Sequence, residues 1–327
     1  MNTYTCIYLS PHLDDAILSC GGRIWQQAQV GESVLVVTIF AAAPAPDIRL
    51  SPFAQELHTQ WGHLTDAVSI RQEEDMAALT LLGAEAMHWP YQDCIYRQTA
   101  SGSFPYASYE ALWGEVHPTD NELVAELTAR LAALPLAQGG TIYAPLGVGH
   151  HVDHQIVRRA VDKSTDGATD NGATDGSTDK RITDGATDGS TDERITDRST
   201  DGSTDKRITD GSTDERITDG ATDKSTDGST DERITDGAGY ALIYYEDFPY
   251  AEDAQAVQAA LGEDKWRAEL IPLSQEAVEA KIAAIACYSS QLSLFWTGEA
   301  DMAQAVRAFA ERTGGGRPAE RYRRRLP

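Results

Sequence analysis

The chain has 327 residues, of which 41% are hydrophobic, and this is enough for one large α/β domain or two small ones. Its formal net charge of −24 excludes proteins that bind a nucleic-acid backbone or an anionic membrane through a basic face. No apolar run of about 18 residues or more and no signal-peptide pattern is present, so no membrane insertion and no export are expected.

Strands and helices are predicted to alternate along the chain. Short apolar runs rich in β-branched residues predict strands at residues 5–10, 33–40, 86–89, 141–144 and 241–246. Apolar residues three and four positions apart predict helices at residues 14–30, 69–82, 121–134, 151–161, 275–289 and 299–312. This alternation predicts an α/β fold with a Rossmann-like, mostly parallel sheet flanked by helices, whose functional residues lie beyond the carboxyl ends of the strands.

Residues 163–237 differ in composition from the rest of the chain. They are nearly all Ser, Thr, Asp, Gly, Lys, Arg and Ile, and the nonamer STDERITDG occurs at residues 212–220 and 229–237. Five isoleucines are the only large apolar side chains, too few to offset the entropy of ordering the segment. We predict a disordered low-complexity insertion in one domain formed by residues 1–162 and 238–327. A calcium-binding solenoid is disfavoured because the units lack glycine pairs and an apolar residue in each rung.

Two polar motifs directly follow two of the predicted strands. The first is SPHLDD at residues 10–15, and the second is GVGHHVDH at residues 147–154. Because parallel strands end at the same edge of a sheet, these turns can lie side by side and bring two imidazoles and a carboxylate to one point. Three nitrogen or oxygen ligands, an open position and a nearby base are what a catalytic zinc site requires.

The first motif resembles the PHPDDE signature of the LmbE-like deacetylases, the family that includes the GlcNAc-phosphatidylinositol de-N-acetylases (PIG-L), and the second resembles its HxDH signature. Further similar segments are RQEE at residues 71–74, Asp93, and Lys281 with YSSQ at residues 288–291. The resemblance covers nearly all of the chain except the repeats. It implies the family's fold and zinc-dependent hydrolysis of an N-acetyl amide on a GlcNAc-type amino-sugar conjugate.

By position, the resemblance implies that His12, Asp15 and His154 bind Zn2+. It also implies that Asp14 is the general base for the water that zinc activates. The alternative is a polar helix start, in which an aspartate caps free N–H groups, but this does not account for His12. A site of two histidines and one carboxylate also accepts Fe2+, which is therefore the alternative metal.

Four further residues receive roles from the resemblance. His151 would stabilise the tetrahedral oxyanion or protonate the departing amine, and Asp153 would orient its ring. Arg71 and Asp93 would bind sugar hydroxyls. The alternative for Arg71 is an ion pair on its own helix, and the alternative for Asp93 is a turn.

The chain departs from the family pattern at three positions. Leu13 and Ala16 stand where the family has Pro and Glu, and neither position is a metal ligand or the base. Gly149 stands where some members place a tyrosine as an added oxyanion donor, so this donor is absent or comes from elsewhere. His150 lies four residues before His154, a spacing that can chelate a metal on a helix, but its place in the turn makes this less favoured.

Other functions stay open. The site could be a zinc amidase for a non-sugar amide or thiol conjugate, the chain could be a non-catalytic sugar- or nucleotide-binding module, or its function could reside in interactions of the acidic repeats. Four scattered cysteines without a CxxC pair predict a reduced, cytoplasmic protein. The predicted partner is a small-molecule amino-sugar conjugate, with homo-oligomerisation left open.

Overall fold

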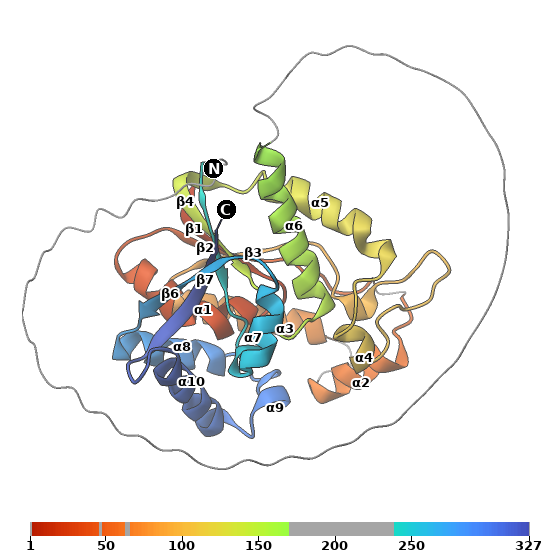
Figure 1. Ribbon diagram of the computed structural model, residues 1–327. Coiled ribbons are helices and arrows are strands. Elements are labelled where there is room, and N and C mark those ends of the chain that lie inside the picture. The colour runs from red at the N-terminus through yellow and green to blue at the C-terminus, as the bar shows by residue number, and fades with distance from the viewer. Residues whose placement is uncertain (1, 46–47, 63–65, 170–238, 327) are drawn as a thin grey trace, which may run out of the picture. The chain divides into compact units, whose positions relative to one another are not determined.

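Seven strands form one mixed sheet in the computed structural model, which describes residues 2–45, 48–62, 66–169 and 239–326. The order across the sheet is β3-β2-β1-β4-β5-β7-β6 (Figure 1). The parallel strands are β1 (Tyr4–Ser10), β2 (Val34–Thr38), β3 (Glu85–His88), β4 (Leu136–Pro145) and β5 (Ala241–Tyr245). The antiparallel strands are β6 (Trp266–Pro272) and β7 (Ala319–Arg325). This mostly parallel sheet confirms the predicted fold class.

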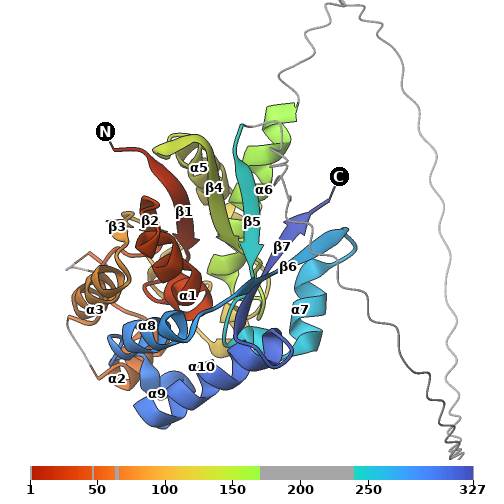
Figure 2. The same cartoon turned by 90° about the vertical axis from the view of Figure 1, so that its left-hand side faces the viewer.

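Helices cover both faces of the sheet, and Figure 2 shows α1 and α8 in front of it with α5 and α6 behind. Side chains alternate between the faces, as strand geometry requires: Tyr8 and Val36 face one layer, whereas Ile7 and Val37 face the other. Because both faces are buried, the strands read as continuous apolar runs. The first layer contains α1 (Asp15–Gln29), α3 (Ala67–Leu82), α8 (Gln275–Ala286) and α10 (Glu299–Thr313). The second contains α5 (Asn121–Leu131), α6 (Val152–Thr169) and α7 (Ala254–Leu261).

The strand order reverses between β1 and β4. These strands are hydrogen-bonded neighbours, although β2 and β3 separate them along the chain and lie on the far side of β1. In open α/β sheets, ligands bind in the crevice outside such a switch point, at the carboxyl ends of the strands. Both polar motifs begin at this place, because β1 leads into the turn before α1 and β4 leads into the turn before α6.

Several elements were not predicted. Strand β7 reads AERYRRR and has no apolar run, and it pairs with the edge strand β6, four of whose seven residues are exposed. Neither strand therefore has a clear hydrophobic pattern in the sequence. Helix α2 (Pro52–Gln60) had a readable start, because Ser51 caps it and Pro52 occupies its first turn. The short helices α4 (Tyr109–Leu112) and α9 (Leu292–Phe295) were also missed.

Helix α6 continues to Thr169, as expected for a helix that runs into the insertion, whose predicted start is residue 163. Adding a residue to an existing helix costs much less free energy than starting a helix. Polar residues can therefore continue the helix beyond the part of α6 that packs on the sheet. Residues 170–237 of the predicted insertion lie outside the described residues, and the domain division therefore stays a prediction. Among the described residues, no helix has the length and apolar character needed to cross a membrane.

Candidate active site

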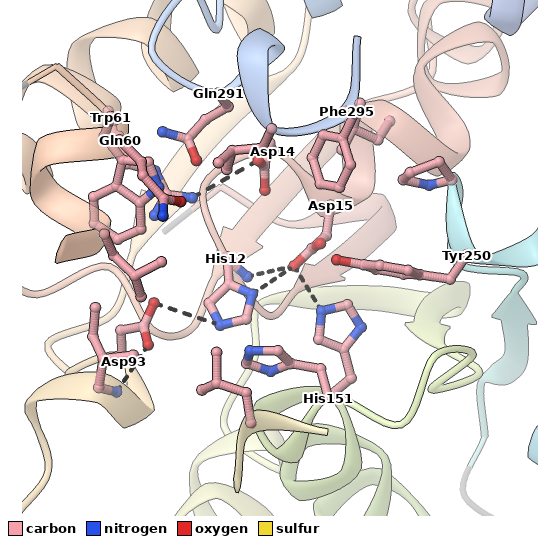
Figure 3. A pocket seen from close by; sticks show the side chains of 18 of the residues that line it. His12, Asp14, Asp15, Gln60, Trp61, Asp93, His151, Tyr250, Gln291 and Phe295 are labelled. Carbon is pink, nitrogen blue, oxygen red and sulfur yellow. Dashed lines mark hydrogen bonds and ion pairs between the residues drawn. The ribbon is translucent and has the colours of Figure 1, made fainter. Parts of the chain in front are cut away.

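The two motif turns meet at the carboxyl ends of β1 and β4 (Figure 3). The turn after β1 is held by Ser10, whose hydroxyl accepts the Ala16 N–H at 3.0 Å and donates to the His12 carbonyl at 2.6 Å. The carboxylate of Asp15 accepts the backbone N–H of His12 at 2.7 Å. His154 approaches from the first turn of α6, and it is buried like His12 and Asp15. We call the three predicted metal ligands, His12, Asp15 and His154, the metal trio.

One oxygen of Asp15 lies between the two imidazoles of the trio. Asp15 Oδ2 is 3.2 Å from His12 Nδ1 and 3.2 Å from His154 Nε2. The other nitrogen of each ring faces another carboxylate, because His12 Nε2 is 3.0 Å from Asp153 Oδ2 and His154 Nδ1 is 2.8 Å from Asp247 Oδ1. A neutral imidazole has a single N–H and cannot donate at both nitrogens. Each ring therefore needs an added cation, either a proton or a metal ion, beside one nitrogen.

The electrostatics of the trio favour positive charge. Burial opposes the protonation of His154, but Asp15 and Asp247 outweigh it and raise the pKa of His154 to about 10. The same balance between burial and carboxylates raises the pKa of His12 well above its usual value. Burial opposes the ionisation of Asp15, yet the two histidines hold the pKa of Asp15 well below its usual range. The site thus stabilises a cation at the shared oxygen.

The donor types fit zinc, which accepts two imidazole nitrogens and a carboxylate oxygen as ligands. Donors on a tetrahedral zinc ion lie about 3.3 Å apart when each bond is about 2.0–2.1 Å long, close to the two 3.2 Å separations around Asp15 Oδ2. Asp153 and Asp247 lie at the outer nitrogens of the rings, where carboxylates orient metal-binding histidines. His12, His151 and His154 also bring one ring nitrogen each within 4.8 Å of one another, so His151 is a competing ligand.

Asp14 lies beside the trio and faces a different partner. Its Oδ2 is 3.8 Å from Arg71 Nη2, and its backbone has φ 157° and ψ −32°, a conformation rarely adopted by residues with a side chain. Burial and the charge of Asp15 raise the pKa of Asp14 to about 7, against the opposing effect of Arg71. A carboxylate whose pKa is near neutrality is suited to accept a proton.

Asp153 contacts His151 through its backbone rather than through its carboxylate. The Asp153 carboxylate lies 2.7 Å from Arg97 Nη2 and 3.0 Å from His12 Nε2, and it accepts the Cys94 N–H at 3.0 Å. A guanidinium is always charged and therefore outcompetes a neutral imidazole for this buried carboxylate. The backbone N–H of Asp153 instead donates to His151 Nδ1 at 3.2 Å, which leaves Nε2 as the N–H donor. Burial and the charge of His12 lower the pKa of His151, so the ring is neutral.

Both predicted substrate-binding residues line the same cavity as the trio. The Arg71 guanidinium lies 4.9 Å from the centre of the Trp61 ring and faces Asp14, rather than an acidic residue of its own helix. One oxygen of Asp93 accepts a backbone N–H at the start of the 3-10 helix η1 (Cys94–Tyr96). The predicted turn role of Asp93 and a position in the cavity therefore coexist.

The cavity has a volume of about 370 Å³. His150, whose spacing to His154 suggested chelation, is not among its lining residues, and its exposed ring faces Glu115. Asp247 was missed, although a carboxylate two residues after the end of β5 lies at the same sheet edge as the motifs. The apolar walls of the cavity were not predicted from the sequence, because most of their residues belong to elements that were not predicted. They are formed by Leu57, Trp61, Tyr109, Leu112, Trp113, Pro249, Tyr250, Leu294 and Phe295.

Several known proteins resemble this chain in sequence or in fold. Residues 7–165 match the sequence model of the PIG-L family, described as GlcNAc-PI de-N-acetylase. Over 169 residues the chain is 28% identical to 2'-N-acetylparomamine deacetylase of Niallia circulans, a match that spans 47% of this chain and 60% of that relative.

Two solved structures have the same fold. The zinc-inhibited form of teicoplanin deacetylase has a TM-score of 0.67 and 24% identity, and the match covers 98% of each chain. The A40926 pseudoaglycone deacetylase has a TM-score of 0.60 and 22% identity, and the match covers 99% of this chain and 98% of that one. Both signature motifs lie inside the segment of residues 7–165 that is similar to the PIG-L (LmbE-like) family, and they lie on adjacent strand ends.

Proposed function

We propose that this chain is a zinc-dependent N-deacetylase that hydrolyses the N-acetyl amide of a GlcNAc-type amino-sugar conjugate and releases acetate and a free amine. The observation that carries the proposal is the oxygen of Asp15 between two imidazoles that each face a second carboxylate, in a cavity that also contains Asp14. The Niallia circulans relative and both solved structures are named deacetylases, which supports this choice.

The metal trio would hold the zinc ion, and Asp153 and Asp247 would fix the orientation of its two imidazoles. When bound, zinc polarises the amide carbonyl and brings the pKa of water toward neutrality. Asp14 would accept the proton of the attacking water at its carboxylate. The Nε2–H of His151 would donate to the oxyanion or to the departing amine. The net reaction adds one water molecule across the C–N bond.

The substrate would be held by polar groups near the reacting centre and by apolar walls around it. Arg71 would donate to sugar oxygens and Asp93 would accept from sugar hydroxyls. The cavity volume of about 370 Å³ lies within the range of about 300–1,000 Å³ that is usual for small-molecule sites. The aromatic walls would exclude bulk water and so strengthen the polar contacts inside.

The direct test is acetate release from N-acetylglucosamine conjugates by zinc-loaded protein, before and after chelation, with an iron-loaded sample in parallel. Hydrolysis that disappears on chelation and returns with zinc supports the proposal. Acetamides without a sugar and acetylated thiol conjugates belong in the same panel. If only these compounds are hydrolysed, the proposed zinc chemistry stands and the proposed substrate class is wrong. Binding of acetamido sugars without any hydrolysis would favour a non-catalytic binding module.

A further inference from the structure

The loop between β5 and α7 brings a phenol into the wall of the cavity. Asp247 ties this loop to the second motif, because it contacts His154 Nδ1 and accepts the backbone N–H groups of Gly147 and Val148, both at 2.8 Å. Three residues later, Tyr250 lines the cavity with its ring edge-on to His154, at a centroid distance of 6.4 Å and an interplanar angle of 81°. The bond that orients a metal-trio histidine thus also positions this loop.

The ring of Tyr250 fits because Gly149 has no side chain. A Cβ at Gly149 would lie 2.8 Å from Tyr250 Cγ, closer than carbon atoms pack, and the φ of Gly149 is +90°, which L side chains rarely adopt. On its other sides the ring packs edge-to-face against Trp113 at 5.2 Å and lies 6.3 Å from Phe295. The direction of the phenol is therefore fixed by its neighbours.

The hydroxyl of Tyr250 points toward Asp15 in Figure 3. Within the part of the chain that the structure describes, no hydrogen bond joins this hydroxyl to another residue. Other phenols near the cavity do have partners, since Tyr109 donates to Gln60 and Tyr96 bonds to His58. A tyrosine phenol carries its proton at neutral pH and can donate it in a hydrogen bond. This hydroxyl is therefore a donor that is available to a substrate oxygen.

We infer that Tyr250 is a catalytic residue whose hydroxyl donates a hydrogen bond to the acetyl oxygen as that oxygen becomes negatively charged. The inference rests on the proposed function. When water adds to the carbonyl carbon, the C=O π electrons move to this oxygen, and they re-form the double bond when the C–N bond breaks. Tyr250 keeps its proton throughout and stabilises the intermediate charge. The missing side chain at Gly149 is thus what admits the ring of Tyr250 to the cavity wall.

The variant Tyr250→Phe keeps the ring and removes only the donor. Loss of one oxyanion donor lowers kcat by about 10²–10³-fold, so we expect this fall in kcat with KM, zinc content and melting temperature near the wild-type values. Tyr91→Phe is the matched control, because the Tyr91 hydroxyl bonds to Glu126 on the surface. An N-trifluoroacetyl substrate should narrow the difference between Tyr250→Phe and wild type, because its fluorines already stabilise the oxyanion.

Two results would overturn the inference alone. An unchanged kcat in Tyr250→Phe would mean that the hydroxyl does not touch the reacting oxygen. A raised KM with an unchanged kcat would mean that Tyr250 binds the substrate equally in the ground and transition states. Absence of hydrolysis by the zinc-loaded wild type would overturn the proposed function and this inference with it, so the two failures are distinguishable.

Discussion

Two buried ionic clusters contact helix α1, and they differ in how their charges are satisfied. Along the middle of the helix, Lys281 Nζ donates to Glu320 Oε1 at 2.8 Å and to the Ser19 carbonyl at 2.9 Å. Glu320 also accepts the backbone N–H groups of Gly22 and Arg23. All of these partners belong to the chain, and together they join α1, α8 and β7. We call Lys281 and Glu320 the structural pair.

At the start of α1 the arginines alone do not balance the carboxylates. Two guanidiniums, Arg71 and Arg97, lie among a larger number of carboxylates, and the cluster opens into a cavity. The carboxylates are Asp14, Asp15, Asp93, Asp153 and Asp247. The difference teaches that a buried cluster whose charges are all satisfied by its own chain joins elements of the fold and needs no added ion. A cluster with excess negative charge beside a cavity is instead suited to bind a cation and a ligand.

The largest expected effect comes from removing the oxygen that the two trio histidines share. Asp15→Ala should bind no zinc and should lose hydrolysis by about 10⁴-fold or more, because the metal supplies several kcal/mol of transition-state stabilisation. The control is His151→Ala, which should keep its zinc while activity falls. Metal content by atomic spectrometry checks both variants. Zinc retained by Asp15→Ala but lost from His151→Ala would make His151 the ligand instead.

The structural pair should matter for stability and not for metal. Lys281→Met leaves the Glu320 carboxylate buried and unpaired, so it should lower the free energy of unfolding by about 3–5 kcal/mol. Arg307→Ala is the matched control, because its ion pair with Glu279 is exposed and is worth about 1 kcal/mol or less. Urea unfolding measures both variants. A loss of zinc from folded Lys281→Met would erase the distinction between the two clusters.

A substitution at Asp247 tests the role of the carboxylates that face the outer nitrogens of the trio histidines. Asp247→Asn keeps a hydrogen-bond acceptor but removes the charge that supports His154, so zinc affinity should fall by about 10–100-fold. Competition with a chromophoric chelator measures this affinity. An unchanged affinity would restrict Asp247 to anchoring the loop through the backbone groups of Gly147 and Val148.

The smallest effect is expected from the repeats. Replacing residues 170–238 by a short Gly-Ser linker should leave the melting temperature within a few degrees of wild type and kcat/KM within about twofold. The reason is that the composition of this segment cannot support a core. Loss of both folding and hydrolysis would make the repeats part of the catalytic domain. Loss of a binding partner alone would locate an interaction function in the acidic repeats.

The sequence predicted those parts of the molecule that depend on local pattern. The buried parallel strands are visible in the sequence as apolar runs. Because the two motifs follow the ends of two such strands, His12, Asp15 and His154 were expected to lie close together. The antiparallel pair of β6 and β7 has no such pattern. Partners that depend on packing were not foreseen either. The Asp153 carboxylate forms an ion pair with Arg97, a residue that belongs to neither motif. Tyr250 lines the cavity only because Gly149 has no side chain.

The most direct test of the central claim separates the metal from the base. Zinc content and amine release from an N-acetylglucosamine conjugate would be measured for wild type and for Asp14→Asn, which keeps the size of the side chain. We predict about one zinc per chain in both proteins and a fall in kcat of about 10²–10⁴-fold in the variant alone. A wild-type protein that cannot be loaded with zinc or iron, or an Asp14→Asn variant with wild-type kcat, would contradict the account.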